Sequence, residues 1–296
     1  MGTVKKTVWL MSMAILVLAL YAILIARLNV SQTDVIFGDS DSVYVGNELA
    51  SYSDPDAVVD TVDDDGYDWP DIDITLAQYA LVNTKNLLSS AYEPDLALQE
   101  DGETYEPIHG TRYQAFAALG KPYLDQMLTD MEELGFTPYI ASSYRTYSYQ
   151  SQLFNTKAFG IFMEMGYTNA DYDEYFEDTE SEVYLAYQKA AEKAQSYTAP
   201  AGASEHQLGL AVDIWDMPRQ SLGSYSYLDE DFRNWLEENA WQYGFIQRYP
   251  TKKLLRTGWD EPWHYRYVGV EVAKFIKETG MCYEEFYVHY MPDADV

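Results

Sequence analysis

An uncharged run of residues near the N-terminus, Thr7–Ala26, limits where a folded domain can lie in this chain. A helix of about 20 residues spans roughly 30 Å, which is the thickness of the hydrocarbon core of a bilayer. A helix that is apolar on every side, at the extreme end of the chain, has no evident partner in a soluble core. We therefore expect residues 1–27 to form a short cytoplasmic stub and a transmembrane anchor.

The basic residues around this run predict its orientation. Lys5 and Lys6 precede it, only Arg27 follows closely, and the next base is Lys85. The positive-inside rule then places the N-terminus in the cytoplasm and the long C-terminal part outside, in a single-pass protein of the cell membrane. A cleaved signal peptide is the alternative. Its apolar region runs about 7–15 residues and ends in a small-x-small site, whereas this run is longer and lacks a convincing site.

The segment after the anchor is acidic and contains no base. Thirteen acidic residues fall between Asp34 and Asp73, and no Lys or Arg occurs from Leu28 to Thr84. Like charges at this density repel one another and do not collapse onto a core. Residues 28–74 are therefore expected to be an extended extracellular linker.

The charge and the cysteine content exclude some classes of partner and bond. The formal net charge is -29 for 296 residues, so nucleic acid and anionic lipid surfaces are poor partners. Cys282 is the only cysteine, which rules out an intrachain disulfide. We interpret it as a buried, inert thiol and not as a metal ligand.

From about residue 75 the pattern becomes globular, and residues 75–296 are predicted to form a single domain. Apolar periodicity and glycine stops predict helices at Gly120–Leu134, Tyr184–Gln195, Phe232–Tyr243 and Val270–Thr279, and strands at 136–141, Leu208–Ile214 and Trp263–Val268. These elements do not alternate regularly, which favours an α+β fold with a small, mainly antiparallel sheet flanked by helices. Residues 166–182, with seven acids, are expected to be an inserted surface loop, or alternatively a lid over the substrate.

Two short motifs contain the candidate chemistry. His206 and Asp213 flank a small and apolar stretch, which suits one ligand in a loop and one on the following strand. Glu261 and His264 lie three residues apart around Pro262, which argues against the helical H-E-x-x-H arrangement. Each pair alone is a weak signal, because an Asp that caps a strand or a buried Glu with another partner would look the same.

Together, the two motifs match the needs of a zinc hydrolase. Two imidazoles and one carboxylate hold zinc and leave a fourth position for water, and a second carboxylate takes a proton from that water. The two other histidines, His109 and His289, stand in ordinary contexts and are expected to be surface or structural residues.

Five blocks in one order make the combined signal specific. The chain resembles the VanY-type D-alanyl-D-alanine carboxypeptidases over roughly residues 76–288. The similar stretches are 81–96, Ser142–Tyr147 with Gln150, Ser204–Asp213, 235–250 and Glu261–Gly269. Departures from the family pattern are Leu87 in place of proline, Tyr265 in place of phenylalanine, and the acidic insert.

This resemblance implies roles for individual residues. It implies zinc held by His206, Asp213 and His264, with Glu261 as the catalytic base. It also implies substrate-binding residues, namely Arg145, Ser204 and Gln150. Among these, Arg145 is expected to bind the terminal carboxylate of the substrate, because its planar guanidinium recognises carboxylates through two parallel hydrogen bonds; a structural ion pair is the alternative for this residue.

The predicted activity is removal of the terminal D-Ala from peptidoglycan stem peptides by a monomeric, membrane-anchored zinc carboxypeptidase. The sequence does not distinguish this activity from L,D-carboxypeptidase or D,D-dipeptidase activity at the same site. A cell-wall-binding module without catalysis is the alternative of a different class, and the presence of all four chemical residues argues against it.

Overall fold

The computed structural model describes residues 66–97, 115–174, 179–216 and 230–296. The predicted anchor, most of the predicted linker and His109 lie outside these ranges. No helix within the described ranges is long and apolar enough to cross a membrane.

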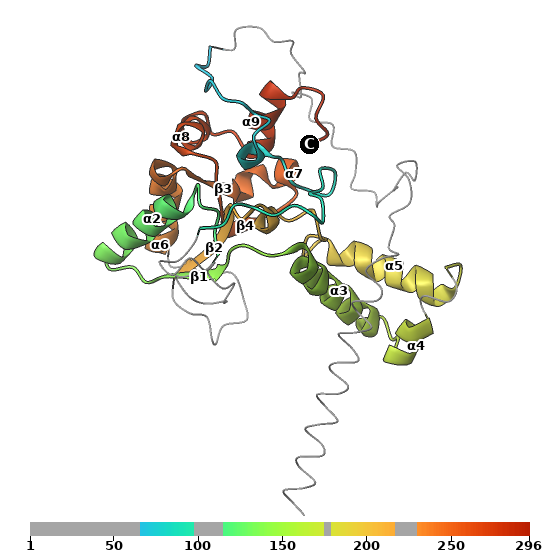
Figure 1. The fold of residues 1–296 in the computed structure, drawn as a ribbon. Helices are drawn as coiled ribbons and strands as arrows, with labels where there is room; N and C mark the ends of the chain where they lie inside the picture. Colours follow the sequence, from blue (N-terminus) through green and yellow to red (C-terminus); the bar gives the residue numbers. More distant parts are fainter. Residues whose placement is uncertain (1–65, 98–114, 175–178, 217–229) are drawn as a thin grey trace, which may run out of the picture. The chain divides into compact units, whose positions relative to one another are not determined.

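A four-stranded sheet, in the order β1-β2-β4-β3, lies at the centre of the described domain (Figure 1). Every neighbouring pair is antiparallel. The strands are β1 (Pro138–Ser142), β2 (Ala211–Asp216), β3 (Phe245–Tyr249) and β4 (Glu261–Tyr267). A small antiparallel sheet among helices confirms the α+β prediction.

The two central strands, β2 and β4, are buried along most of their length. In β2, every residue except the last is buried, and the last four residues of β4 are also buried. Such strands show no clean alternation of apolar and polar residues. Polar side chains on them therefore lie in a desolvated interior, where their charges need partners.

Helices surround the sheet, and most of the predicted ones are confirmed with small shifts of their ends. They are α2 (Lys121–Glu133), α3 (Tyr147–Glu164), α4 (Asn169–Glu174), α5 (Glu182–Ala194), α6 (Glu230–Asn239), α7 (Leu254–Thr257), α8 (Val270–Thr279) and α9 (Tyr283–Tyr290). Short 3-10 helices are η2 (Ala77–Tyr79), η3 (Glu205–Leu208), η4 (Ala240–Tyr243) and η5 (Thr251–Lys253).

The insert differs from the predicted surface loop. α3 and α5 run side by side, and α4, within the insert, packs on α5 (Figure 1). Tyr167 stacks on Phe162 with ring centroids 4.6 Å apart, and Tyr172 meets Phe159 edge-on. The aromatic residues of this acidic segment therefore form a local core with α3 and α5, and the part before residue 175 is a structured element.

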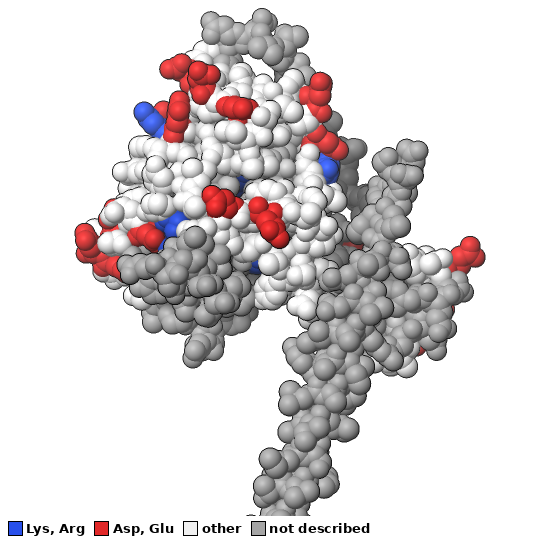
Figure 2. All heavy atoms as spheres, viewed as in Figure 1, with Lys and Arg blue, Asp and Glu red and all other residues white. Residues whose placement is uncertain are grey.

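Buried side chains form two further clusters around the sheet. The main cluster lies between the sheet, α2 and α6, and the other lies between α8, α9 and the segment from η2. Cys282 is buried, as expected for an inert thiol. Acidic side chains outnumber basic ones on the face shown in Figure 2, in keeping with the net charge.

Residues 66–74 contact the folded domain, although the sequence analysis placed them in the linker. The Trp69 ring stacks on His289 at a centroid distance of 3.6 Å, and the Tyr290 hydroxyl donates a hydrogen bond to the carbonyl of Pro70. The compact unit accordingly begins at Gly66. Apolar burial of Trp69 outweighs the repulsion between the few acids that flank it, because charges on the surface are screened by solvent.

Candidate active site

Sheet register and a short 3-10 helix bring three predicted ligands together. Asp213 on β2 pairs directly with His264 on β4, and His206 lies in η3, just before β2. Asp213 Oδ1 is 3.1 Å from His264 Nδ1 and 3.4 Å from His206 Nε2. The three ligand atoms lie within 4.8 Å of one another, as a shared metal ion requires.

The outer nitrogen of each imidazole faces a hydrogen-bond partner. His206 Nδ1 lies 2.7 Å from the carbonyl oxygen of Ser143, so this nitrogen donates and Nε2 is left as a ligand. His264 Nε2 faces Glu205 Oε2 at 3.4 Å. Metal-bound histidines are commonly oriented in this way by a carbonyl or a carboxylate. Two imidazole nitrogens and one carboxylate oxygen also form a donor set that suits zinc.

Burial and neighbouring charges shift the pKa values of these residues. Burial, together with the nearby Arg145 cation, lowers the pKa of His206 to about 4, so its ring is neutral at pH 7. Burial acts against the ionised form of Asp213, but the two histidines hold the pKa of its carboxyl far below the usual value. Burial also lowers the pKa of His264, yet hydrogen bonds to Asp213 and Glu205 dominate and raise it to about 9.

Glu261 is the first residue of β4 and lies beside the cluster. Its carboxylate is 3.7 Å from His264 Nδ1, and its side chain keeps 22% of its accessible surface. Desolvation raises the pKa of Glu261 to about 7. A carboxylate with a pKa near neutrality can both accept and return a proton at pH 7, which is the requirement for a general base.

Arg145 follows β1 and is held by three side chains. Its Nε donates to Ser142 Oγ at 2.8 Å and its Nη1 donates to Gln150 Oε1 at 3.1 Å. Its Nη2 lies 3.4 Å from Asp213 Oδ2. The side chain is 18% exposed, so part of the guanidinium remains open to the cleft.

Gln150 and Ser204 both line the same cleft, but they are buried. The amide nitrogen of Gln150 donates to the carbonyl of Ala199 at 2.6 Å, and its oxygen accepts from Arg145. In this structure Gln150 therefore holds Arg145 in place, and its expected contact with substrate stays a prediction. Ser204 is the N-cap residue of η3 but makes no side-chain capping hydrogen bond, and its expected contact with substrate also stays a prediction.

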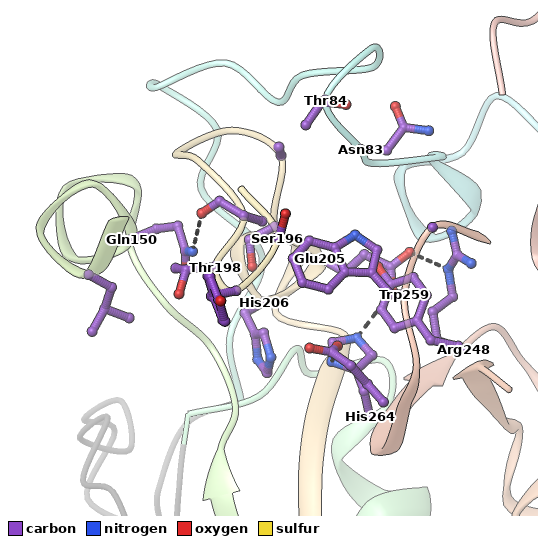
Figure 3. A pocket seen from close by; sticks show the side chains of 18 of the residues that line it. Asn83, Thr84, Gln150, Ser196, Thr198, Glu205, His206, Arg248, Trp259 and His264 are labelled. Atoms are coloured by element: carbon purple, nitrogen blue, oxygen red, sulfur yellow. Dashed lines mark hydrogen bonds and ion pairs between the residues drawn. The ribbon is translucent and has the colours of Figure 1, made fainter. Parts of the chain in front are cut away.

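These residues line one cleft of about 1320 Å³, shown from close by in Figure 3. The cleft reaches from α3 and the segment 196–199 across the histidines to Trp259, and its wall includes Trp215 stacked on Trp263 with centroids 5.1 Å apart. It is large enough for a short peptide and combines apolar walls with a few converging polar groups, as ligand sites do.

Sequence reasoning missed Glu205, which stands immediately before His206. Its carboxylate contacts Arg248, Arg266 and His264 in the buried interior. A weak signal was available, since Arg248 and Arg266 each lie between aromatic residues in β3 and β4. Buried arginines need a buried acid, but the sequence does not single out Glu205 among the many acids of the chain.

A buried His-Asp-His cluster, a carboxylate with a raised pKa beside it and an arginine in the same cleft together define a candidate site of the metallopeptidase class. The chain belongs to the VanY D-alanyl-D-alanine carboxypeptidase family, whose family model matches residues 118–270.

Individual relatives agree with this assignment. The chain is 35% identical over 207 residues to a D-alanyl-D-alanine carboxypeptidase of Enterococcus faecalis, with 70% of this chain and 64% of the relative covered. It is similar to a crystal structure of the vancomycin-resistance D,D-pentapeptidase VanY with Zn(II), at 32% identity, a TM-score of 0.51 and coverage of 71% and 99%. It is also similar to the LD-carboxypeptidase LdcB, at 28% identity, a TM-score of 0.53 and coverage of 71% and 85%. The chain thus spans about two thirds of its Enterococcus faecalis relative.

Proposed function

We propose that this protein is a zinc-dependent D-alanyl-D-alanine carboxypeptidase that removes the terminal D-Ala from peptidoglycan stem peptides. The observation that carries the proposal is the convergence of His206, Asp213 and His264 with Glu261 and Arg145 in one cleft. The family relationship and the Zn(II) bound to the VanY relative support both the metal and the reaction.

The chain's own residues provide the proton transfers. When bound by His206, Asp213 and His264, zinc would supply an acidified water and polarise the scissile carbonyl. Glu261 accepts the proton of the attacking water and then transfers it to the nitrogen of the departing D-Ala. Its raised pKa suits both steps, because a strongly acidic carboxyl would hold the proton too weakly.

Arg145 gives the proposed enzyme its preference for a chain end. Its guanidinium is held by Ser142 and Gln150 through Nε and Nη1, so the orientation of the remaining N–H groups is set before substrate binds. A terminal carboxylate can accept from two such N–H groups at once, whereas an internal peptide bond offers no negative charge. This preorganised cation supports exopeptidase rather than endopeptidase activity.

We further propose that Thr7–Ala26 anchors the protein in the cell membrane, with the catalytic domain outside and acting as a monomer. The charge distribution supports the orientation, because the bases lie at the N-terminus and the acidic segment follows the apolar run. An extended acidic tether would let the domain reach cell-wall substrate near the membrane.

The test is release of D-Ala from a synthetic stem pentapeptide by the purified protein. Activity should disappear after chelation of metal, return on addition of zinc, and be lost in Glu261→Ala while zinc is still bound. Glu278→Ala, at an exposed carboxylate on α8 outside the cluster, is the matched control. Full activity of the metal-stripped protein or of Glu261→Ala would refute the mechanism.

L,D-carboxypeptidase activity on stem tetrapeptides is a second candidate, favoured by the comparable similarity to LdcB. Both reactions need the same metal site and the same recognition of a terminal carboxylate. Mass spectrometry of the digested peptides distinguishes the two activities. A D,D-carboxypeptidase removes D-Ala from the pentapeptide, and an L,D-carboxypeptidase removes D-Ala from the tetrapeptide.

A further inference from the structure

Glu205 is a buried carboxylate next to the His-Asp-His cluster that the proposed reaction does not use. Its side chain has no accessible surface. One oxygen, Oε1, accepts hydrogen bonds from Arg248 Nε at 2.8 Å and from Arg266 Nη1 at 2.6 Å. Within the described part of the chain, the partner of the other oxygen, Oε2, is His264 Nε2 at 3.4 Å (Figure 3). Two guanidinium groups therefore anchor the carboxylate on one side, and the imidazole lies on the other.

The sheet explains why these groups meet. His264 and Arg266 are two residues apart on β4, so both side chains leave the same face of the strand. Arg248 lies on the neighbouring strand β3 and also forms a two-pronged ion pair with Glu284 of α9, with N–O distances of 2.9 and 2.6 Å. Two buried acids are thus balanced by two buried bases, and this balance fixes the position of Glu205.

The two arginine contacts leave one oxygen of Glu205 for the imidazole. Because Arg248 and Arg266 both donate to Oε1, Oε2 is the atom that faces His264. A metal ion held where the three ligand atoms converge would bind the nitrogen on that side, which leaves the nitrogen facing Glu205, Nε2, to carry the proton. The opposite nitrogen of His264, Nδ1, lies 3.1 Å from Asp213 Oδ1, on the side where the three ligand atoms converge.

We propose that Glu205 is the positioning residue of His264, which holds the ring with Nε2–H toward its own carboxylate and Nδ1 toward the metal. The inference rests on the proposed zinc site. The Nε2–Oε2 distance of 3.4 Å is long for a hydrogen bond, so Glu205 acts through charge and orientation more than through a short bond. The Arg248–Glu284 pair links α9 to this arrangement, because it holds Arg248 against Glu205.

A purely structural role makes a different prediction. If Glu205 only neutralised Arg248 and Arg266, its replacement would lower stability and leave the affinity of the folded protein for zinc unchanged. A positioning residue behind a metal ligand instead changes metal affinity by roughly 10- to 100-fold when it is removed. Zinc affinity therefore separates the two roles without reference to catalysis.

The first experiment compares zinc dissociation constants, measured by competition with a chromogenic chelator, for the wild type and Glu205→Gln. We expect about 10- to 100-fold weaker binding and a changed visible spectrum of the cobalt-substituted protein. Leu128→Ala is the control. Truncation of this buried α2 side chain should lower stability without touching the zinc ligands, so the variant should bind zinc as tightly as the wild type. A folded Glu205→Gln protein with wild-type affinity and spectrum would overturn the proposal.

The second experiment uses the unaltered protein, so it does not depend on the variant folding. Nitrogen-15 spectra of the zinc-loaded protein should show His264 with the proton on Nε2 and the metal on Nδ1. A ring bound to metal through Nε2 would overturn the inference and leave the proposed function standing. A wild type that binds no zinc at all would overturn both.

Discussion

Asp213 on β2 and His264 on β4 lie directly opposite each other in an antiparallel pair, although they are 51 positions apart in the chain. Residues paired in this way project their side chains on the same face of a sheet, about 5 Å apart. A slip of one residue in either strand would turn one of the two side chains to the opposite face. The register of the sheet therefore determines whether a metal site exists at all.

Replacement of Asp213 by asparagine should remove most of the zinc affinity. The amide keeps the shape of the side chain but lacks the charge that both histidines and Arg145 face. We expect zinc binding to weaken by more than about 100-fold, beyond the usual effect of a residue outside the ligand shell. Competition with a chelator measures this. Asp216→Asn, at the end of the same strand, should bind zinc like the wild type, and equal losses in both variants would contradict the assignment of Asp213 as a ligand.

Arg145→Lys should weaken substrate binding more than turnover. Lysine keeps the charge but loses the planar pair of donors that fits a carboxylate, so we expect kcat/KM on a stem pentapeptide to fall about 10- to 100-fold, mainly through KM. Arg256→Lys, at an arginine that also lines the cleft, is the matched control and should leave both constants unchanged.

A pentapeptide with an amidated C-terminus checks the reason for the effect of Arg145→Lys. The wild type should cleave this peptide far more slowly than the free acid, and the variant should discriminate less between the two peptides. An unchanged preference for the free acid in the variant would show that another group binds the terminal carboxylate.

Tyr265→Phe should raise stability. The Tyr265 hydroxyl is buried without a hydrogen-bond partner among the described residues, and an unsatisfied buried polar group costs about 1–3 kcal/mol. Tyr283→Phe is the matched control, because its hydroxyl donates to the carbonyl of Tyr79 at 2.7 Å. We expect the control to lose about 0.5–1.5 kcal/mol of unfolding free energy in urea. A loss of stability in Tyr265→Phe would show that its hydroxyl has a partner.

The sequence predicted the parts of the fold and site that depend on local pattern. The helices around Leu124 and Val272 were predicted correctly. The strand predicted at Leu208–Ile214 is confirmed only in part, because Leu208 belongs to η3 and β2 begins at Ala211. The ligands were recognisable because His206 and Asp213 lie close in sequence and Glu261 and His264 form a second short motif. Strand register, which joins the two motifs, is a long-range property that neither motif contains.

The missed features depend on contacts between distant segments. α3 has no clear apolar stripe, and its buried side pairs with α5, so tertiary packing decides its conformation. Nothing local in the sequence distinguishes Glu205, whose role depends on contacts with Arg248 of β3 and Arg266 of β4. Trp69 likewise joins the domain by stacking on His289, which no local feature of the acidic segment indicates.

The capping box of α9 should make stability depend on pH. Glu285 accepts hydrogen bonds from Lys253 and from the backbone of Cys282 at 2.7–2.9 Å. Although partial burial opposes the charge, these contacts lower the pKa of Glu285 below its usual value. The pKa of Glu285 is lower in the folded state than in the unfolded state. The ionised carboxylate therefore stabilises the fold, and this stabilisation is fully present at pH values above the unfolded-state pKa of about 4.3. This stabilisation is lost as the pH falls through the lower, folded-state value.

Glu285→Gln should therefore cost about 1 kcal/mol of unfolding free energy at pH 7, the usual value of a helix cap. The difference from the wild type should shrink as the pH falls below about 4, because both proteins then carry an uncharged side chain. Urea unfolding between pH 7 and pH 3 measures this. Glu278→Gln is the control, since its exposed pair with Lys274 at 3.8 Å contributes little at any pH. A difference that stays constant down to pH 3 would mean that the carboxylate charge of Glu285 does not stabilise α9.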